Sequence, residues 1–136
     1  MADIKSSVKA ILDTKDYTSN NKIYNSTEDA IANLERLVFT DYAIAIGDMR
    51  MERDVLRPKG FVKSRTFLDI ILFIKKNDPH IEVEDTQELL SVLLYNNPVS
   101  IPYCSFIHVN DWSEEIRYND NISYSIATVE ILRFLP

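Results

Sequence analysis

The sequence contains 136 residues, of which 46% are hydrophobic, and its formal charge is −6. This length and composition predict one folded domain spanning residues 1–136 and exclude extensive disorder. No apolar stretch approaches the ~20 residues that cross a bilayer, and the first residues lack the layout of a secretory signal. We therefore expect synthesis in the cytoplasm and no membrane partner.

Two residue counts narrow the classes of site further. Cys104 is the single cysteine, which excludes an internal disulfide and offers at most one thiolate to a metal. Glycine occurs only at Gly47 and Gly60, whereas loops that wrap phosphates need several glycines. We therefore expect no nucleotide cofactor, and the negative charge argues against a general nucleic-acid coat.

Two helices are expected at the start of the chain. Apolar residues at helical spacing predict a short amphipathic helix over residues 3–13. The polar residues 14–26 are expected to form a loop. Ser26 stands three residues before Asp29, and this spacing predicts a capped helix over residues 27–37.

A long buried strand is the clearest pattern in the sequence. Residues 42–46 predict a strand that ends at Gly47, and residues 48–61 lead through a turn to a second strand over 62–76. Within this strand, the eight residues 67–74 are apolar at every position but one. Such a run predicts a strand that is covered on both faces.

The C-terminal half adds a helix and more strands. Asp85 or Thr86 caps a helix with a broad apolar face that ends at Tyr95. The expected strands are residues 101–109, 112–118 and 122 onward. The resulting fold class is α+β, a mostly antiparallel sheet packed against two or three helices, with a protruding β-arm or long loop at 48–65.

Cysteine and histidine form no recognisable site. Cys104 and His108 are four residues apart in an expected strand, so they would share a face at about 13 Å, using ~3.3 Å per residue. That distance is too great for a shared metal or a nucleophile–base pair, and His80 lies in an expected turn. We therefore expect no metal, no cofactor and no catalytic residue, and thus no enzyme.

Carboxylates cluster in two places. The first group is Glu84, Asp85 and Glu88, and the second is Asp111, Glu114 and Glu115. The first lies in the opening turn of an expected helix, where the helix dipole favours negative charge. The second lies in an expected hairpin loop, and neither group has the ligand spacing of a calcium loop. Solvated caps and turns explain them better than a metal or acid–base site.

Asp69 is the polar interruption of the apolar run. A carboxylate in such a strand should have a hydrogen-bond partner if it is buried. It marks a strand edge, a partnered acid or a subunit contact, and the sequence leaves these alternatives open.

Positive charge concentrates between residues 48 and 65. The cationic residues there are Arg50, Arg53, Arg57, Lys59, Lys63 and Arg65, against three acidic residues, so the segment is net +3 in a chain that is net −6. An extended arm of this composition suits docking onto an acidic protein surface, including that of an identical subunit. Nucleic acid passing through a pore and a solvated hairpin are the alternatives.

The order of these elements resembles that of tail-terminator and tail-to-head joining proteins of tailed bacteriophages. The resemblance covers most of the chain and lies in the pattern of elements. After an N-terminal helix come residues 42–47, a variable loop and the strand 66–75, and then the helix 86–95, the strand 103–109 and a last hairpin ending in 122–134. The polar loop at 14–26 and the second helix are longer than this pattern implies.

The resemblance implies a structural role in the virion neck or tail. Subunits would close into a homo-oligomeric ring, typically sixfold, with connector or adaptor and tail-tube proteins as partners and DNA passing through. No catalytic residue carries over. In such a ring the basic arm of one copy and an acidic group of the next are candidate interface partners.

Two other functions remain open. A monomeric inhibitor or immunity-type protein would cover a basic partner with the second acidic group and Tyr118. An enzyme of another type would centre on Asp69, His108 and Cys104, which form no known motif. A closed oligomer in native mass spectrometry would separate the ring from the inhibitor.

Overall fold

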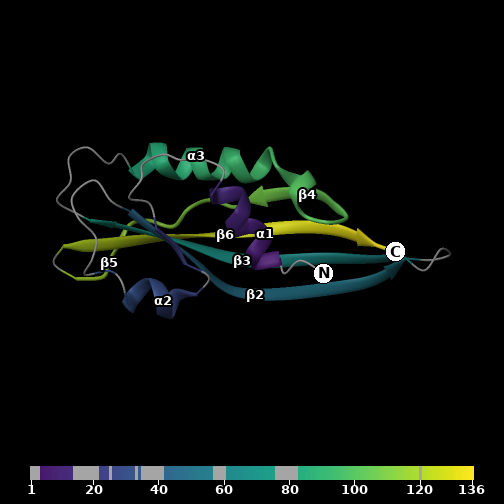
Figure 1. Cartoon of the computed structure of the whole chain (residues 1–136), viewed down its shortest axis with the longest axis horizontal. Helices are drawn as coiled ribbons and strands as arrows, with labels where there is room; N and C mark the ends of the chain where they lie inside the picture. The colour runs from purple at the N-terminus through teal and green to yellow at the C-terminus, as the bar shows by residue number, and fades with distance from the viewer. Residues whose placement is uncertain are drawn as a thin grey trace.

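The computed structural model describes residues 4–13, 22–24, 26–32, 34, 42–56, 61–75, 83–119 and 121–136. The elements in chain order are α1 (Ile4–Asp13), β1 (Lys22–Tyr24), α2 (Thr27–Ala32), β2 (Tyr42–Leu56), β3 (Phe61–Lys75), α3 (Val83–Tyr95), the 3₁₀ helix η2 (Pro98–Ser100), β4 (Cys104–Val109), β5 (Ile116–Arg117) and β6 (Ile122–Leu135). Figure 1 shows one twisted sheet with helices on both of its faces.

The sheet is mostly antiparallel, and the predicted α+β fold class is confirmed. Its strand order is β1-β2-β3-β6-β4, with β5 also paired to β6. β1 runs parallel to β2, whereas the β2–β3, β3–β6, β4–β6 and β5–β6 pairs are antiparallel. The three longest strands, β2, β3 and β6, therefore form the centre of the sheet.

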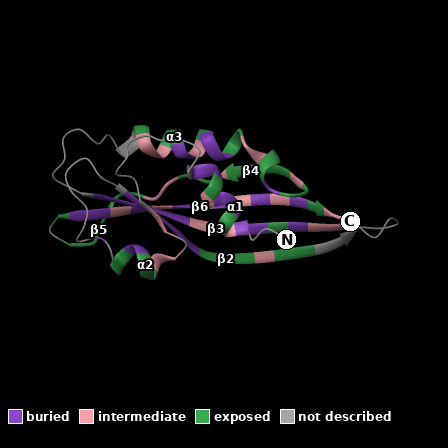
Figure 2. Cartoon of the chain, in the orientation of Figure 1, coloured by how far each residue is buried: buried purple, intermediate pink, exposed green. Residues whose placement is uncertain are grey.

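Two hydrophobic clusters cover opposite faces of this sheet. On one face, which we call the α1–α3 face, side chains of α1 and α3 pack on Leu68, Ile70 and Leu72 of β3. On the other, the α2 face, α2 packs on Ile71 and Phe73. The alternation follows the two-residue period of a strand. It confirms that this part of the apolar run is covered on both faces (Figure 2).

Strand β2 is much longer than the sequence predicts. The expected end at Gly47 is wrong, because a β-bulge between Ile46 and Met49 lets the pairing with β3 continue to Leu56. A Cβ at Gly47 would lie 3.4 Å from Asp69 Cβ, a van der Waals contact, so the two strands lie close together at this position. Of the β-arm and the long loop that were expected after Gly47, the structure has the β-arm, because β2 stays paired with β3 beyond the bulge.

The β2–β3 hairpin accounts for the expected arm. Its distal half pairs on one side with the end of β6, from Val62↔Leu135 to Phe67↔Glu130. The distal ends of β2, β3 and β6 extend past the helices as a three-stranded ribbon (Figure 1). We call residues 49–56, 61–67 and 130–135 the distal arm.

Other boundaries also differ from those expected. Strand β1 arises within the expected loop 14–26, and the expected strand over 112–118 shrinks to Ile116–Arg117. Backbone and hydroxyl groups of Ser113 bond to β6 instead, with N–H to Ile126 O at 2.8 Å. The helix expected over 27–37 is described as Thr27–Ala32, and most of its expected remainder lies outside the described residues.

Candidate interaction surfaces

The cationic residues of the distal arm lie on both faces of the sheet. Arg50 lies on the α2 face, where its guanidinium is 4.8 Å from the centroid of the Phe67 ring. Arg65 is on the same face, and its Nε lies 3.9 Å from Glu130. Arg53 pairs with the buried Ser64 and thus lies on the α1–α3 face.

Exposed carboxylates partly neutralise this positive surface. Arg50 Nη2 lies 3.9 Å from Glu52 Oε1, with both side chains more than half exposed. Lys63 is half-buried in β3. Arg57 and Lys59 occupy the connection between β2 and β3 and lie outside the described residues. A surface pair of this kind contributes little to stability, so the Arg50 guanidinium stays available to a partner.

The two acidic groups lie at the other end of the sheet. Asp85 and Glu88 are exposed in the first turns of α3, and the backbone of Glu84 belongs to the same helix. Asp111 and Glu114 are exposed in the segment between β4 and β5. Glu115, also exposed, accepts a hydrogen bond from the Ser123 hydroxyl.

A chain of hydrogen bonds holds both acidic groups against the start of β6. Gln87 Nε2 of α3 donates to Ser125 Oγ at 3.0 Å, and Ser125 Oγ donates to Ser113 O at 2.6 Å. Trp112 Nε1 donates to Ser91 Oγ of α3 at 3.0 Å. These side chains fix the acidic segment and the start of α3 relative to each other.

Charges of opposite sign are thus separated along β6. Ser125 lies beside the acidic groups, whereas Arg133 lies in the distal arm. The eight residue steps between them correspond to about 26 Å at ~3.3 Å per residue. The molecule therefore has an acidic end and a basic arm, a charge distribution that suits contacts between successive copies.

Cys104 and His108 were expected to lie on the same face of a strand, and they do not. A β-bulge at Cys104 and Phe106 reverses the alternation of β4, so Cys104 is opposite Arg133 while His108 is opposite Glu130. The prediction that Cys104 and His108 share a face is wrong for this reason. His108 instead lines an open hollow of about 230 Å³ between α3 and β4, and His80 lies outside the described residues.

Burial dominates the environment of Cys104. It raises the pKa of the thiol, and the charge of Arg133 partly offsets this rise. Burial also lowers the pKa of the Arg133 guanidinium, and the positive charge of nearby Arg53 lowers it further. Sequence reasoning missed Arg133, because a single arginine in an apolar strand gives no sign of which face it occupies.

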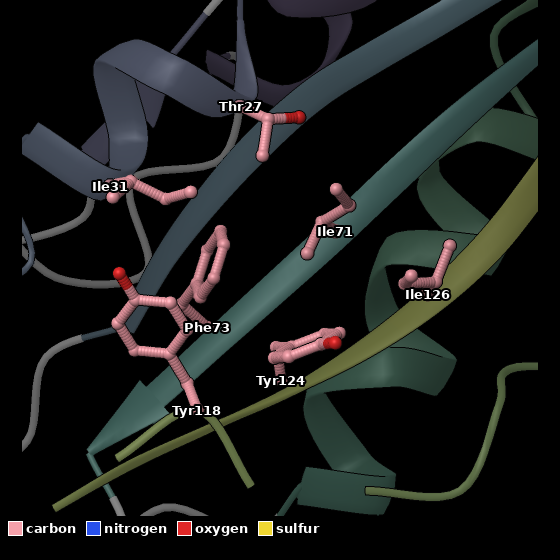
Figure 3. Close-up of a pocket in the computed structure, with 7 residues that line it drawn as sticks. All are labelled: Thr27, Ile31, Ile71, Phe73, Tyr118, Tyr124 and Ile126. Atoms are coloured by element: carbon pink, nitrogen blue, oxygen red, sulfur yellow. The ribbon is translucent and has the colours of Figure 1, made fainter. Parts of the chain in front are cut away.

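An apolar pocket lies on the α2 face at the acidic end (Figure 3). Its volume is about 210 Å³, and it is lined by Thr27 and Ile31 of α2, Ile71 and Phe73 of β3, Tyr124 and Ile126 of β6, and Tyr118. The Phe73 ring meets Tyr118 edge-on, with centroids 6.2 Å apart and an interplanar angle of 82°. A cavity of roughly 150 Å³ accommodates benzene, so this pocket has room for one ring or one large apolar side chain.

The pocket also was not predicted from the sequence. Its β3 side chains belong to the run that was expected to be buried, and that expectation gave no sign of an opening. Alternating aromatic and aliphatic residues at the start of β6, Tyr124 and Ile126, were the available signal.

Two kinds of site can be assessed within the described part of the chain. There, no three His, Cys, Asp or Glu side chains gather closely enough to hold a metal ion. No helix among the described residues is long and apolar enough to span a bilayer. No protein-family model and no curated protein matches this sequence.

Proposed function

We propose that this chain is a structural subunit of the neck or tail of a tailed phage, and that it acts by closing into a ring. The basic arm of one copy contacts the acidic end of the next. Six copies are the expected number, with connector and tail-tube proteins above and below the ring and DNA passing through it.

The separation of charge along β6 carries this proposal. An interface between unlike surfaces of identical chains needs two complementary patches on one molecule, placed so that neither covers the other. The net +3 hairpin and the acidic groups are such patches, at opposite ends of the longest strands. The resemblance in element order adds the phage context.

Native mass spectrometry at low ionic strength tests the ring. We expect one closed stoichiometry that dissociates as salt is raised, because exposed charges are screened within about 10 Å at 0.1 M. A protein that stays monomeric at every concentration contradicts the proposal.

Charge reversal tests the interface. We expect Asp111→Lys combined with Glu114→Lys to prevent assembly, since both side chains are exposed at the acidic end. Asp48→Lys is the matched control, because it reverses an exposed carboxylate within the basic hairpin itself. Equal assembly of both variants would contradict the arm-to-acid contact.

The exposed Tyr118 beside the acidic segment favours a second candidate function, a monomeric inhibitor of a basic protein. This function needs no contact between copies. A persistent monomer that binds a basic partner with nanomolar affinity would support it over the ring.

A further inference from the structure

Two arginines flank a serine in one row across the distal arm. Arg53 of β2 is the register partner of Ser64 in β3, and Ser64 is the register partner of Arg133 in β6. Direct partners place their side chains on the same face. The two arginine Cα atoms are therefore about 10 Å apart, two strand spacings of ~4.8 Å, with the Ser64 side chain between them.

Two buried polar atoms of this row lack partners. Ser64 is fully buried and Arg133 is only 6% exposed. Ser64 Oγ and Arg133 Nε are buried without a hydrogen bond, as is the neighbouring Thr66 Oγ1. Buried groups of this kind are normally bonded, and a buried charge normally has a counter-charge. Three unsatisfied atoms together therefore indicate a missing acceptor.

No described carboxylate supplies that acceptor. Among the described residues of the arm, Arg50 and Arg65 form ion pairs, and both lie on the opposite face. Arg53 Nη2 donates to Met51 Sδ at 3.6 Å, and a thioether is a weak acceptor. The charge of Arg53 lowers the pKa of Arg133, so the two guanidinium groups are close enough to repel each other.

We propose that Arg53 and Arg133 bind a single oxyanion, a phosphate or carboxylate group, over the hydroxyl of Ser64. Guanidinium groups donate pairs of parallel hydrogen bonds that match the oxygens of such groups, and Ser64 Oγ–H adds another donor. Arg53 is exposed and gives access from solvent, while Arg133 forms the buried side. The oxyanion is either free in solution or a carboxylate from the acidic end of a neighbouring copy, and only the second source rests on the proposed ring.

Titration of the full-length protein with inorganic phosphate tests the site, read by calorimetry and by the shift in melting temperature. Arg53→Gln removes one arginine at an exposed position, so the variant should fold. We expect it to weaken phosphate binding by about tenfold or more, as the loss of a charge-assisted hydrogen bond does. Arg50→Gln is the matched control, since it removes an exposed arginine from the opposite face, and it should bind phosphate like the wild type.

The oligomeric mass of the same proteins identifies the source of the oxyanion. Phosphate binding that Arg53→Gln abolishes without changing the mass indicates a free anion. A lower mass for Arg53→Gln than for Arg50→Gln, with phosphate competing against assembly, indicates a neighbour's carboxylate. If wild type and both variants show the same phosphate response and the same mass, the proposed site is wrong. The phosphate titration alone decides this question if the protein is a monomer.

Discussion

Thr128 Oγ1 donates a 3.1 Å hydrogen bond to Asp69 Oδ1. The two residues are direct partners in the β3–β6 register, on the α2 face of the sheet. The carboxylate that interrupts the apolar run therefore has a partner on the adjacent strand. Of the three interpretations that the sequence left open for Asp69, the partnered acid agrees with this geometry.

Replacing Thr128 with valine should destabilise the protein. The change keeps the side-chain shape and removes the donor, so we expect a loss of about 1–2 kcal/mol in the free energy of unfolding. Thr66→Val is the matched control: the Thr66 hydroxyl is buried without a partner, so its removal should be neutral or stabilising. Urea unfolding measures both, and equal losses would contradict the hydrogen bond at Asp69.

The two leucines Leu72 and Leu89 should respond very differently to truncation. Leu72 is fully buried in the cluster beneath α1 and α3, and Leu72→Ala should cost about 2–5 kcal/mol. Leu89 is 50% exposed on α3, so Leu89→Ala should stay within about 0.5 kcal/mol. Chemical unfolding measures both losses of unfolding free energy. Similar losses at the two positions would contradict a buried Leu72 and an exposed Leu89.

The regular parts of the fold were predictable because burial leaves a periodic trace. The α3 helix and the β3 strand combine long apolar patterns with clear end signals in the sequence, which are Asn96-Asn97-Pro98 after Tyr95 and Asn77-Asp78-Pro79 after Lys75. Irregular features were not predicted, because they leave no periodic pattern in the sequence. A bulge adds one residue to a strand and leaves no pattern of its own, so the extension of β2 past Gly47 and the reversal at Cys104 were both missed.

Candidate site residues were harder to place than elements. Charge counts alone found the basic hairpin and the acidic groups, and the register then showed that they lie at opposite ends of β6. The row through Arg53, Ser64 and Arg133 depends on the pairing of Ser64 with Arg133, 69 positions apart, which a single sequence does not encode locally. The apolar pocket likewise arises only from side chains of α2, β3 and β6 that are far apart in the sequence.

Ser91 should anchor the acidic segment through the single tryptophan. Its Oγ accepts the Trp112 indole hydrogen bond and donates to Gln87 O at 2.9 Å. Ser91→Ala leaves the indole N–H without this acceptor, so we expect a loss of about 1 kcal/mol and a red shift of Trp112 emission. Ser100→Ala, at an exposed position in η2, is the control and should change neither. An unchanged emission maximum in Ser91→Ala would mean that the hydrogen bond does not hold the segment.

Cys104 should react slowly with iodoacetamide and should make stability depend on alkaline pH. Burial raises the pKa of the folded thiol above that of the unfolded chain. The unfolded chain therefore loses its proton first, and the free energy of unfolding should fall as pH rises from the unfolded pKa to the folded one. Cys104→Ala should remove this decline.

Arg133→Met takes away a positive charge that lowers the pKa of the Cys104 thiol. The pH midpoint of Cys104 alkylation in this variant, followed by mass spectrometry, should therefore move to still higher pH. Arg53→Met is the control and should leave the midpoint in place, whereas a midpoint below that of the urea-unfolded chain would show that the thiol is not held in a buried environment.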